Sequence, residues 1–72
     1  MEDEKLKRIE GTAKKVYDEL CTRLPSDGTS QRVDYERLAR DVGRVRSTVT
    51  YNIGKLMRVG LVGSDGDKLY LK

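Results

Sequence analysis

Apolar residues in the first third of the chain recur at steps of three and four, the spacing of one face of an α-helix. Gly11 interrupts this pattern, and Thr12 directly after it is a residue type that caps helix starts. The helix is therefore expected either to run from about Asp3 or to begin at Thr12, and Pro25 ends it, so that residues 1–24 form the first-helix segment. The apolar positions of this stripe are Leu6, Ile9, Ala13, Val16, Tyr17, Leu20, Cys21 and Leu24.

Two shorter helical patterns follow a polar loop and are separated by a glycine turn. Asp34 is a good N-cap for a helix of about two turns, and Gly43 is expected to stop that helix in a left-handed conformation. The next helix runs from about Arg46 to Val59, and Gly60 closes it. The residues expected to face the core from these two helices are Tyr35, Leu38, Ala39, Val42, Val49, Ile53 and Leu56.

Strand patterns occupy the end of the chain and one short stretch before the paired helices. The runs Leu61-Val62 and Lys68–Leu71 flank an Asp65-Gly66 pair, which is a strong short-range signal for a β-hairpin. Gln31–Val33 predicts one further, brief strand. The expected order is helix, strand, helix, helix, strand, strand, an α+β fold in one small domain over residues 1–72.

The composition excludes several kinds of site. One cysteine and no histidine allow neither an intrachain disulfide nor a Cys/His zinc cage, and Cys21 is expected to be reduced and packed on the apolar helical face. The acidic pair around Gly66 lacks the other oxygen ligands of a calcium loop, so a hairpin turn without metal is expected. No nucleophile–base pair or phosphate-binding glycine loop occurs, so no enzyme activity and no cofactor are expected. No apolar run approaches the roughly 20 residues of a membrane helix, and a cytoplasmic location is expected.

Positive charge is concentrated in the middle of the chain. Residues 1–30 carry six basic and seven acidic side chains, whereas residues 31–60 carry seven basic and three acidic ones. No acidic residue occurs between Asp41 and Asp65. A nucleic-acid-binding face requires this kind of uneven distribution, although a helix surface rich in solvated arginine also produces it.

The spacing of several short motifs resembles the winged helix-turn-helix domains of bacterial and archaeal transcriptional regulators. The motifs are Leu38-Ala39, Gly43, Arg46-Ser47-Thr48-Val49, the apolar Ile53 and Leu56, and Gly60-Leu61-Val62. The resemblance covers roughly Val33 to Leu71, and it implies a three-helix winged helix-turn-helix with a short C-terminal β-hairpin wing. In that fold residues 34–59 form the helix-turn-helix and residues 60–72 the wing. The chain departs from the family at Val45, where a serine or threonine usually caps the recognition helix.

The helix expected from about Arg46 to Val59 has a polar side opposite its apolar positions. This side carries cations, hydroxyls and one aromatic ring, with no carboxylate. Arg46 lies at the N-terminal end, where recognition helices touch base edges, and arginine suits bidentate contact with guanine. Threonine and tyrosine contact thymine methyl groups or phosphates. Gly54 costs about 1 kcal/mol of helix propensity and permits close approach to a backbone or to DNA. The candidate DNA-binding residues are Arg44, Arg46, Ser47, Thr48, Thr50, Tyr51, Lys55, Arg58 and Lys68.

The wing is expected to contribute little to DNA binding. Lys68 is its cation near the tip, whereas Asp65 and Asp67 place two carboxylates there, which phosphates repel. Tyr70 alternates with two leucines and is expected to pack in the core rather than to contact DNA.

These observations favour a small transcriptional regulator that binds specific double-stranded DNA and acts by occupying an operator. A homodimer is expected because one helix contacts few base pairs, with Leu6 and Ile9 at the interface unless they fold back on their own core. Neither a membrane nor a small-molecule ligand is expected as a partner. The alternatives are an accessory protein of plasmid or viral replication, partition or recombination, and a winged helix used for protein–protein assembly.

Overall fold

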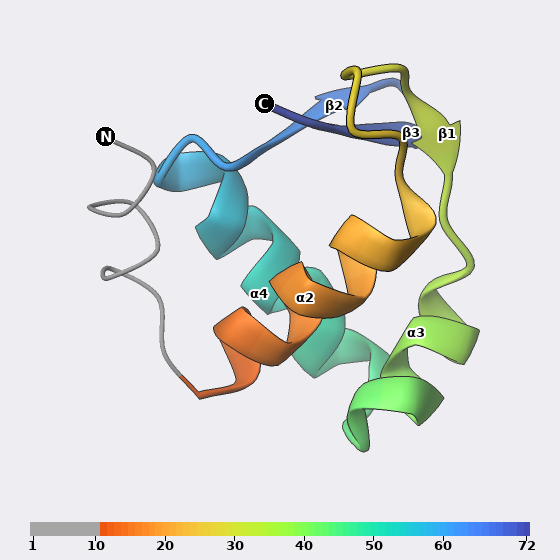
Figure 1. The fold of residues 1–72 in the computed structure, drawn as a ribbon. Helices are drawn as coiled ribbons and strands as arrows, with labels where there is room; N and C mark the ends of the chain where they lie inside the picture. The colour runs from red at the N-terminus through yellow and green to blue at the C-terminus, as the bar shows by residue number, and fades with distance from the viewer. Residues whose placement is uncertain (1–10) are drawn as a thin grey trace.

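The computed structural model describes residues 11–72, which form an α+β fold of three helices and a three-stranded antiparallel sheet. In chain order the elements are α2 (Thr12–Arg23), β1 (Gln31–Arg32), α3 (Tyr35–Val42), α4 (Arg46–Arg58), β2 (Val62–Asp65) and β3 (Lys68–Leu71). The three helices pack on one another, and the sheet lies at one end of them (Figure 1). The predicted fold class and the predicted order of these elements are confirmed.

The first described helix, α2, begins at Thr12, directly after Gly11 with its φ of 64°. The residue before Pro25 is extended, so the helix ends where the proline predicts. The two apolar residues expected at a dimer interface, Leu6 and Ile9, lie outside the described residues.

The start of α3 is fixed by the side chain of Asp34, as the sequence predicts. Its Oδ1 accepts hydrogen bonds from the backbone N–H groups of Glu36, at 3.1 Å, and Arg37, at 3.2 Å. These N–H groups have no partner within the helix, so the cap satisfies two donors that water would otherwise have to satisfy.

The helices α3 and α4 end in the same hydrogen-bonded motif, which is built on a glycine with positive φ. At the end of α3, Gly43 has φ 70° and ψ 34°, its N–H donates to the carbonyl of Arg40, and the N–H of Arg44 donates to that of Ala39. The same pair of bonds closes α4 around Gly60, with φ 82°. This is the Schellman motif, and it leaves residues 43–45 as the whole connection between α3 and α4.

The core side of α4 is the one that the spacing predicts. Val49, Ile53 and Leu56 are at most 2% exposed and pack against α2, α3 and β2. Asn52 is also buried on this helix, and its Nδ2 donates to the carbonyl of Thr48 at 2.8 Å. Because its amide bonds within the helix, Asn52 places a polar side chain in the core without an unpaired donor.

The sheet joins the hairpin to the segment that precedes α3. β3 lies in the middle and pairs antiparallel with both neighbours, in the order β1-β3-β2. The predicted first strand is shorter than expected, because Val33 leaves the sheet and packs, half-buried, against the core. Tyr70 is also half-buried, and its ring covers Gly63 on the opposite strand, where a Cβ would lie 2.3 Å from the ring.

The hairpin turn is expected to tolerate only residues that adopt positive φ at its first position. Asp65 pairs with Lys68, so Gly66 and Asp67 form a two-residue loop, and Gly66 has φ +65°. Replacing Gly66 by valine should lower the free energy of unfolding by about 1–2 kcal/mol, because a β-branched residue is strained in this conformation. Urea unfolding measures the change, with Ser64→Val as the control, because it places the same residue at an exposed position of β2 where φ is not positive. An unchanged midpoint for the valine variant would contradict this reading of the turn.

Every described element except β1 contributes apolar side chains to one core. Two predicted core residues are wrong: Cys21 is exposed, and Tyr70 lies half-buried over Gly63 and is not part of the core. The buried face of α2 is centred on Val16 and Leu20, and Cys21 lies about 100° around the helix from it, beyond the half-buried Tyr17. The buried apolar residues are Ala13, Val16, Leu20, Leu24, Leu38, Ala39, Val42, Val49, Ile53, Leu56, Leu61, Val62 and Leu69.

Candidate nucleic-acid interface

Burial of one side of α4 leaves the opposite side facing solvent. Thr48 lies half-buried at the flank, and Lys68 is exposed on β3 rather than on α4. Tyr51 is 66% exposed, and with Val45 it is one of two large apolar side chains exposed among residues 11–72. The other candidate residues are all exposed, either on α4 or directly before it: Arg44, Arg46, Ser47, Thr50, Tyr51, Lys55 and Arg58. Seven of the nine candidate residues are therefore exposed on the solvent side of α4 or in the turn that leads into it.

Hydrogen bonds within the helix decide which polar groups of this face are available to a partner. Thr50 Oγ1 donates to the carbonyl of Arg46 at 3.1 Å, so this hydroxyl is already bonded within the helix. Arg44 Nη1 donates to the carbonyl of Gly43 at 3.0 Å. Ser47 and Tyr51 make no side-chain hydrogen bond within residues 11–72. Their hydroxyls are therefore the neutral polar groups that remain open to a ligand on this face.

The N-terminus of α4 lacks a side-chain cap, as expected from the valine at position 45, where winged helix-turn-helix domains usually have a serine or threonine. Val45 is extended and accepts hydrogen bonds through its carbonyl from Thr48 and Val49, at 3.1 and 3.2 Å. Its own side chain offers no acceptor to the first-turn N–H groups. These donors carry the positive end of the helix dipole, which adds to the charge of Arg46.

One carboxylate lies closer to this face than the sequence suggests. Glu36, on α3, places its Oε1 3.6 Å from Nη1 of Arg46, and both side chains remain mostly exposed. Tyr35 lies in the same place: burial raises the pKa of its hydroxyl, and the positive charge of Arg46 opposes that shift. No periodicity or spacing signal links Glu36 to Arg46, because the contact depends on how α3 crosses α4.

A cavity of about 410 Å³ lies between the start of α3, the start of α4 and the wing turn. Two ion pairs are found at its wall, the Glu36–Arg46 pair and a second between Arg32 Nη2 and Asp67 Oδ2 at 2.8 Å. The wing-tip carboxylate of Asp67 is thus held toward β1. The residues that line the cavity are Arg32, Val33, Asp34, Tyr35, Glu36, Arg46 and Asp67.

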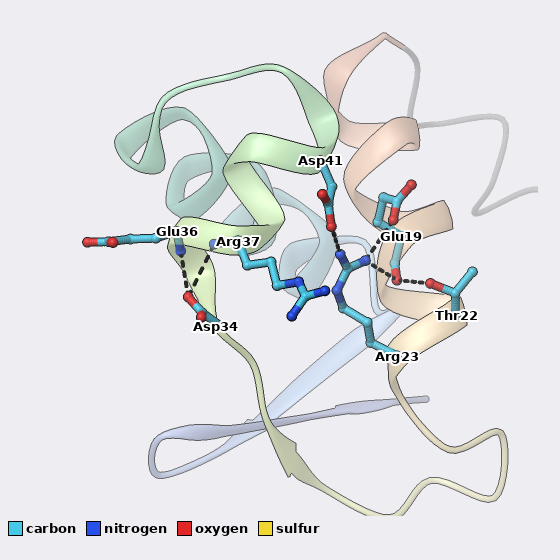
Figure 2. A network of polar contacts seen from close by, with 7 residues as sticks. All are labelled: Glu19, Thr22, Arg23, Asp34, Glu36, Arg37 and Asp41. Carbon is cyan, nitrogen blue, oxygen red and sulfur yellow. Dashed lines mark hydrogen bonds and ion pairs between the residues drawn. The ribbon is translucent and has the colours of Figure 1, made fainter.

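A second polar network fixes α3 against α2 (Figure 2). Arg23 extends from the last turn of α2, contacts the carboxylate of Asp41 on α3, and binds Glu19 through both its carboxylate, at 2.6 Å, and its carbonyl, at 3.1 Å. Thr22 donates to the same carbonyl at 2.7 Å. The side chain of Arg23 thus bonds to both α2 and α3, and it links these two helices by a partly exposed polar contact.

Removing the carboxylate beside Arg46 should strengthen binding to an anionic partner. For Glu36→Gln we expect duplex affinity to rise by up to about fivefold, because an exposed pair of this kind contributes roughly 0.2–1 kcal/mol that binding must replace. Fluorescence anisotropy with a labelled duplex measures the change. Asp18→Asn, which removes the same charge from the exposed surface of α2, is the matched control and should have a smaller effect. Equal effects of the two variants would show that only net charge matters.

The described residues define a class of fold but no family. Three helices and a small three-stranded antiparallel sheet form a layout consistent with a winged helix. No protein-family model, curated protein or solved structure matches this chain. Within residues 11–72, no helix is long and apolar enough to cross a membrane, and no group of three or more cysteine, aspartate or glutamate side chains is placed to hold a metal ion. The exposed polar side of α4 is the main surface feature that bears on function.

Proposed function

We propose that this protein is a small transcriptional regulator that binds specific sequences in double-stranded DNA through α4. The observation that carries the proposal is the exposed face of this helix, which carries cations and the side chains of Ser47 and Tyr51 but no carboxylate of the same helix. The hydroxyls of Ser47 and Tyr51 have no hydrogen-bond partner within residues 11–72. A three-residue glycine turn joins this helix to α3, which is the arrangement of a helix-turn-helix. Binding would act by occupying an operator, which in a bacterial or archaeal cell is a cytoplasmic activity.

The dimensions of α4 suit the major groove. Its 13 residues span about 20 Å, and the groove is wide enough to admit one α-helix. In helix-turn-helix complexes the N-terminal residues of the inserted helix contact base edges. We therefore assign base contacts to Arg46 and Ser47, and phosphate contacts to Lys55 and Arg58 near the C-terminal end.

The groups available on this face favour guanine and thymine as the bases contacted. Arginine donates bidentately to guanine, and the exposed side chains of Thr50 and Tyr51 carry apolar groups that suit the thymine methyl group. Asn52, the amide side chain that would suit adenine, is buried and bonded to the helix backbone. The preferred site is thus expected to present guanine edges and thymine methyl groups to α4.

The wing is assigned a minor role. Asp67 is paired with Arg32, so the tip offers DNA an ion pair rather than a free cation. Lys68 is exposed on β3, and we assign it a phosphate contact.

We further propose that the protein binds as a homodimer. One helix contacts only a few base pairs, and a second copy doubles the length of sequence that is recognised. The half-sites would then form an inverted repeat about one helical turn apart. The proposed interface residues, Leu6 and Ile9, precede the described part of the chain.

Selection of bound sequences from a random duplex pool is the experiment that tests this function. We expect an enriched inverted repeat and an affinity that falls with salt. The slope of log K against log[salt] should be about −3 per protomer if Lys55, Arg58 and Lys68 contact phosphates. Sedimentation equilibrium of the complex gives the stoichiometry. Absence of duplex binding by the parent protein at low salt would exclude the proposal and favour a role in protein–protein assembly. Binding without an enriched sequence would exclude a specific operator.

A further inference from the structure

Gly54 lies in the interior of α4, where glycine is the least favourable residue after proline. Its φ is not in the left-handed region, unlike those of Gly43, Gly60 and Gly66. A Cβ built at Gly54 would meet no heavy atom within 4 Å. Neither the backbone conformation nor the packing of residues 11–72 therefore requires glycine at this position.

The other glycines of the chain have an explanation within the fold. Five of the seven have positive φ, and Gly63 lies under the ring of Tyr70. Gly54 is the one that remains. A glycine that weakens its own helix, and that neither backbone conformation nor steric crowding among residues 11–72 requires, points to a close approach by something outside this part of the chain.

The position of Gly54 indicates what that contact is. Ser47, Tyr51, Gly54 and Arg58 follow one another at steps of four, three and four, so they lie in one row along the side of α4 opposite the core. Their neighbours in the row are exposed, whereas Gly54 presents only backbone. The row therefore lacks a side chain at one position, Gly54, which lies between Tyr51 and Arg58.

We infer that Gly54 is the point at which α4 approaches the floor of the DNA major groove most closely. This inference rests on the proposed function. Because Gly54 has no side chain, base edges come close to the helix backbone there, and Ser47 and Tyr51 come within contact distance of the bases. Arg58 stays at the level of the DNA backbone. A methyl group at Gly54 holds the helix away from the base edges and breaks these contacts together.

The variant Gly54→Ala tests this inference through two measurements that should change in opposite directions. Thermal unfolding should show a Tm raised by about 4–8 °C, because alanine favours the helix and meets no neighbour. Affinity for the selected duplex should fall about tenfold or more, as it does when one base-pair contact is lost. Affinity for an unrelated duplex should change less, because phosphate contacts supply most of that binding.

Cys21→Ala is the matched control, since it also places alanine at an exposed helical position but on α2, which packs on the core side of α4. It should leave affinity for both duplexes unchanged. A Gly54→Ala protein that is more stable and binds the selected duplex as tightly as the parent overturns the inference, while duplex binding by the parent leaves the proposed function intact. A less stable variant also overturns it, and equal losses on both duplexes would place the contact at the phosphate backbone instead.

Discussion

Replacing Leu56 by alanine is expected to lower the free energy of unfolding by about 2–5 kcal/mol, the usual range for truncation of a buried leucine. Leu56 is fully buried in α4, the helix that contacts α2, α3 and β2. Its carbonyl also accepts the N–H of Leu61 in the motif that ends the helix. A domain of this size is stabilised by only about 4–11 kcal/mol, so the variant should lose a large part of its stability.

Urea unfolding monitored by circular dichroism measures this loss. Lys55→Ala, at the preceding exposed position, is the control and should shift the midpoint little. A Leu56→Ala protein with an unchanged midpoint and lost duplex binding would mean that this side of α4, rather than the opposite one, is the contact surface.

Arg46→Ala is expected to weaken binding to the selected duplex by about 1–3 kcal/mol, which is roughly 5- to 150-fold, and to relax the preference at one base position. Arg46 is the first residue of α4, and its side chain is 64% exposed beside Glu36. In helix-turn-helix complexes with DNA, the N-terminal end of the inserted helix contacts the bases, and Arg46 lies at this end of α4. The exposed pair with Glu36 adds little to folding, so stability should stay close to that of the parent.

Competition between the selected duplex and variants changed at single base pairs measures both effects. Lys14→Ala removes one exposed cation from α2 and is the charge-matched control, which should weaken binding only slightly. If Arg46→Ala weakens binding equally on every sequence, Arg46 contacts a phosphate and does not select a base.

The features that the sequence predicts correctly have causes that lie within a few residues. Asp34 caps the helix that begins at the next residue, Gly43 ends it eight residues later, and Gly66 turns the hairpin between adjacent strands. The core side of α4 follows from helical geometry alone, and so does the exposed face that carries the proposed site. These signals act locally, so residue types and their spacing are enough.

The features that the sequence does not reveal depend on contacts between distant segments. Glu36 meets Arg46 and Arg23 meets Asp41 only because of the angles at which the helices cross. The exposure of Cys21 follows from which part of α2 faces the rest of the core, and an apolar stripe with a wide edge does not fix that orientation. The relative orientation of α3 and α4 is set by tertiary packing. The position of the Glu36 carboxylate beside Arg46 is set in the same way.

The Schellman motif at Gly43 has a consequence for any duplex that α4 contacts. Because residues 43–45 are the whole connection and are held by backbone hydrogen bonds, α3 and α4 have little freedom to change their relative orientation. Adjustments needed to fit protein and duplex together would then occur mainly in the DNA. Sequences that bend or untwist easily, such as those with pyrimidine–purine steps, would be favoured even at base pairs that the protein does not touch.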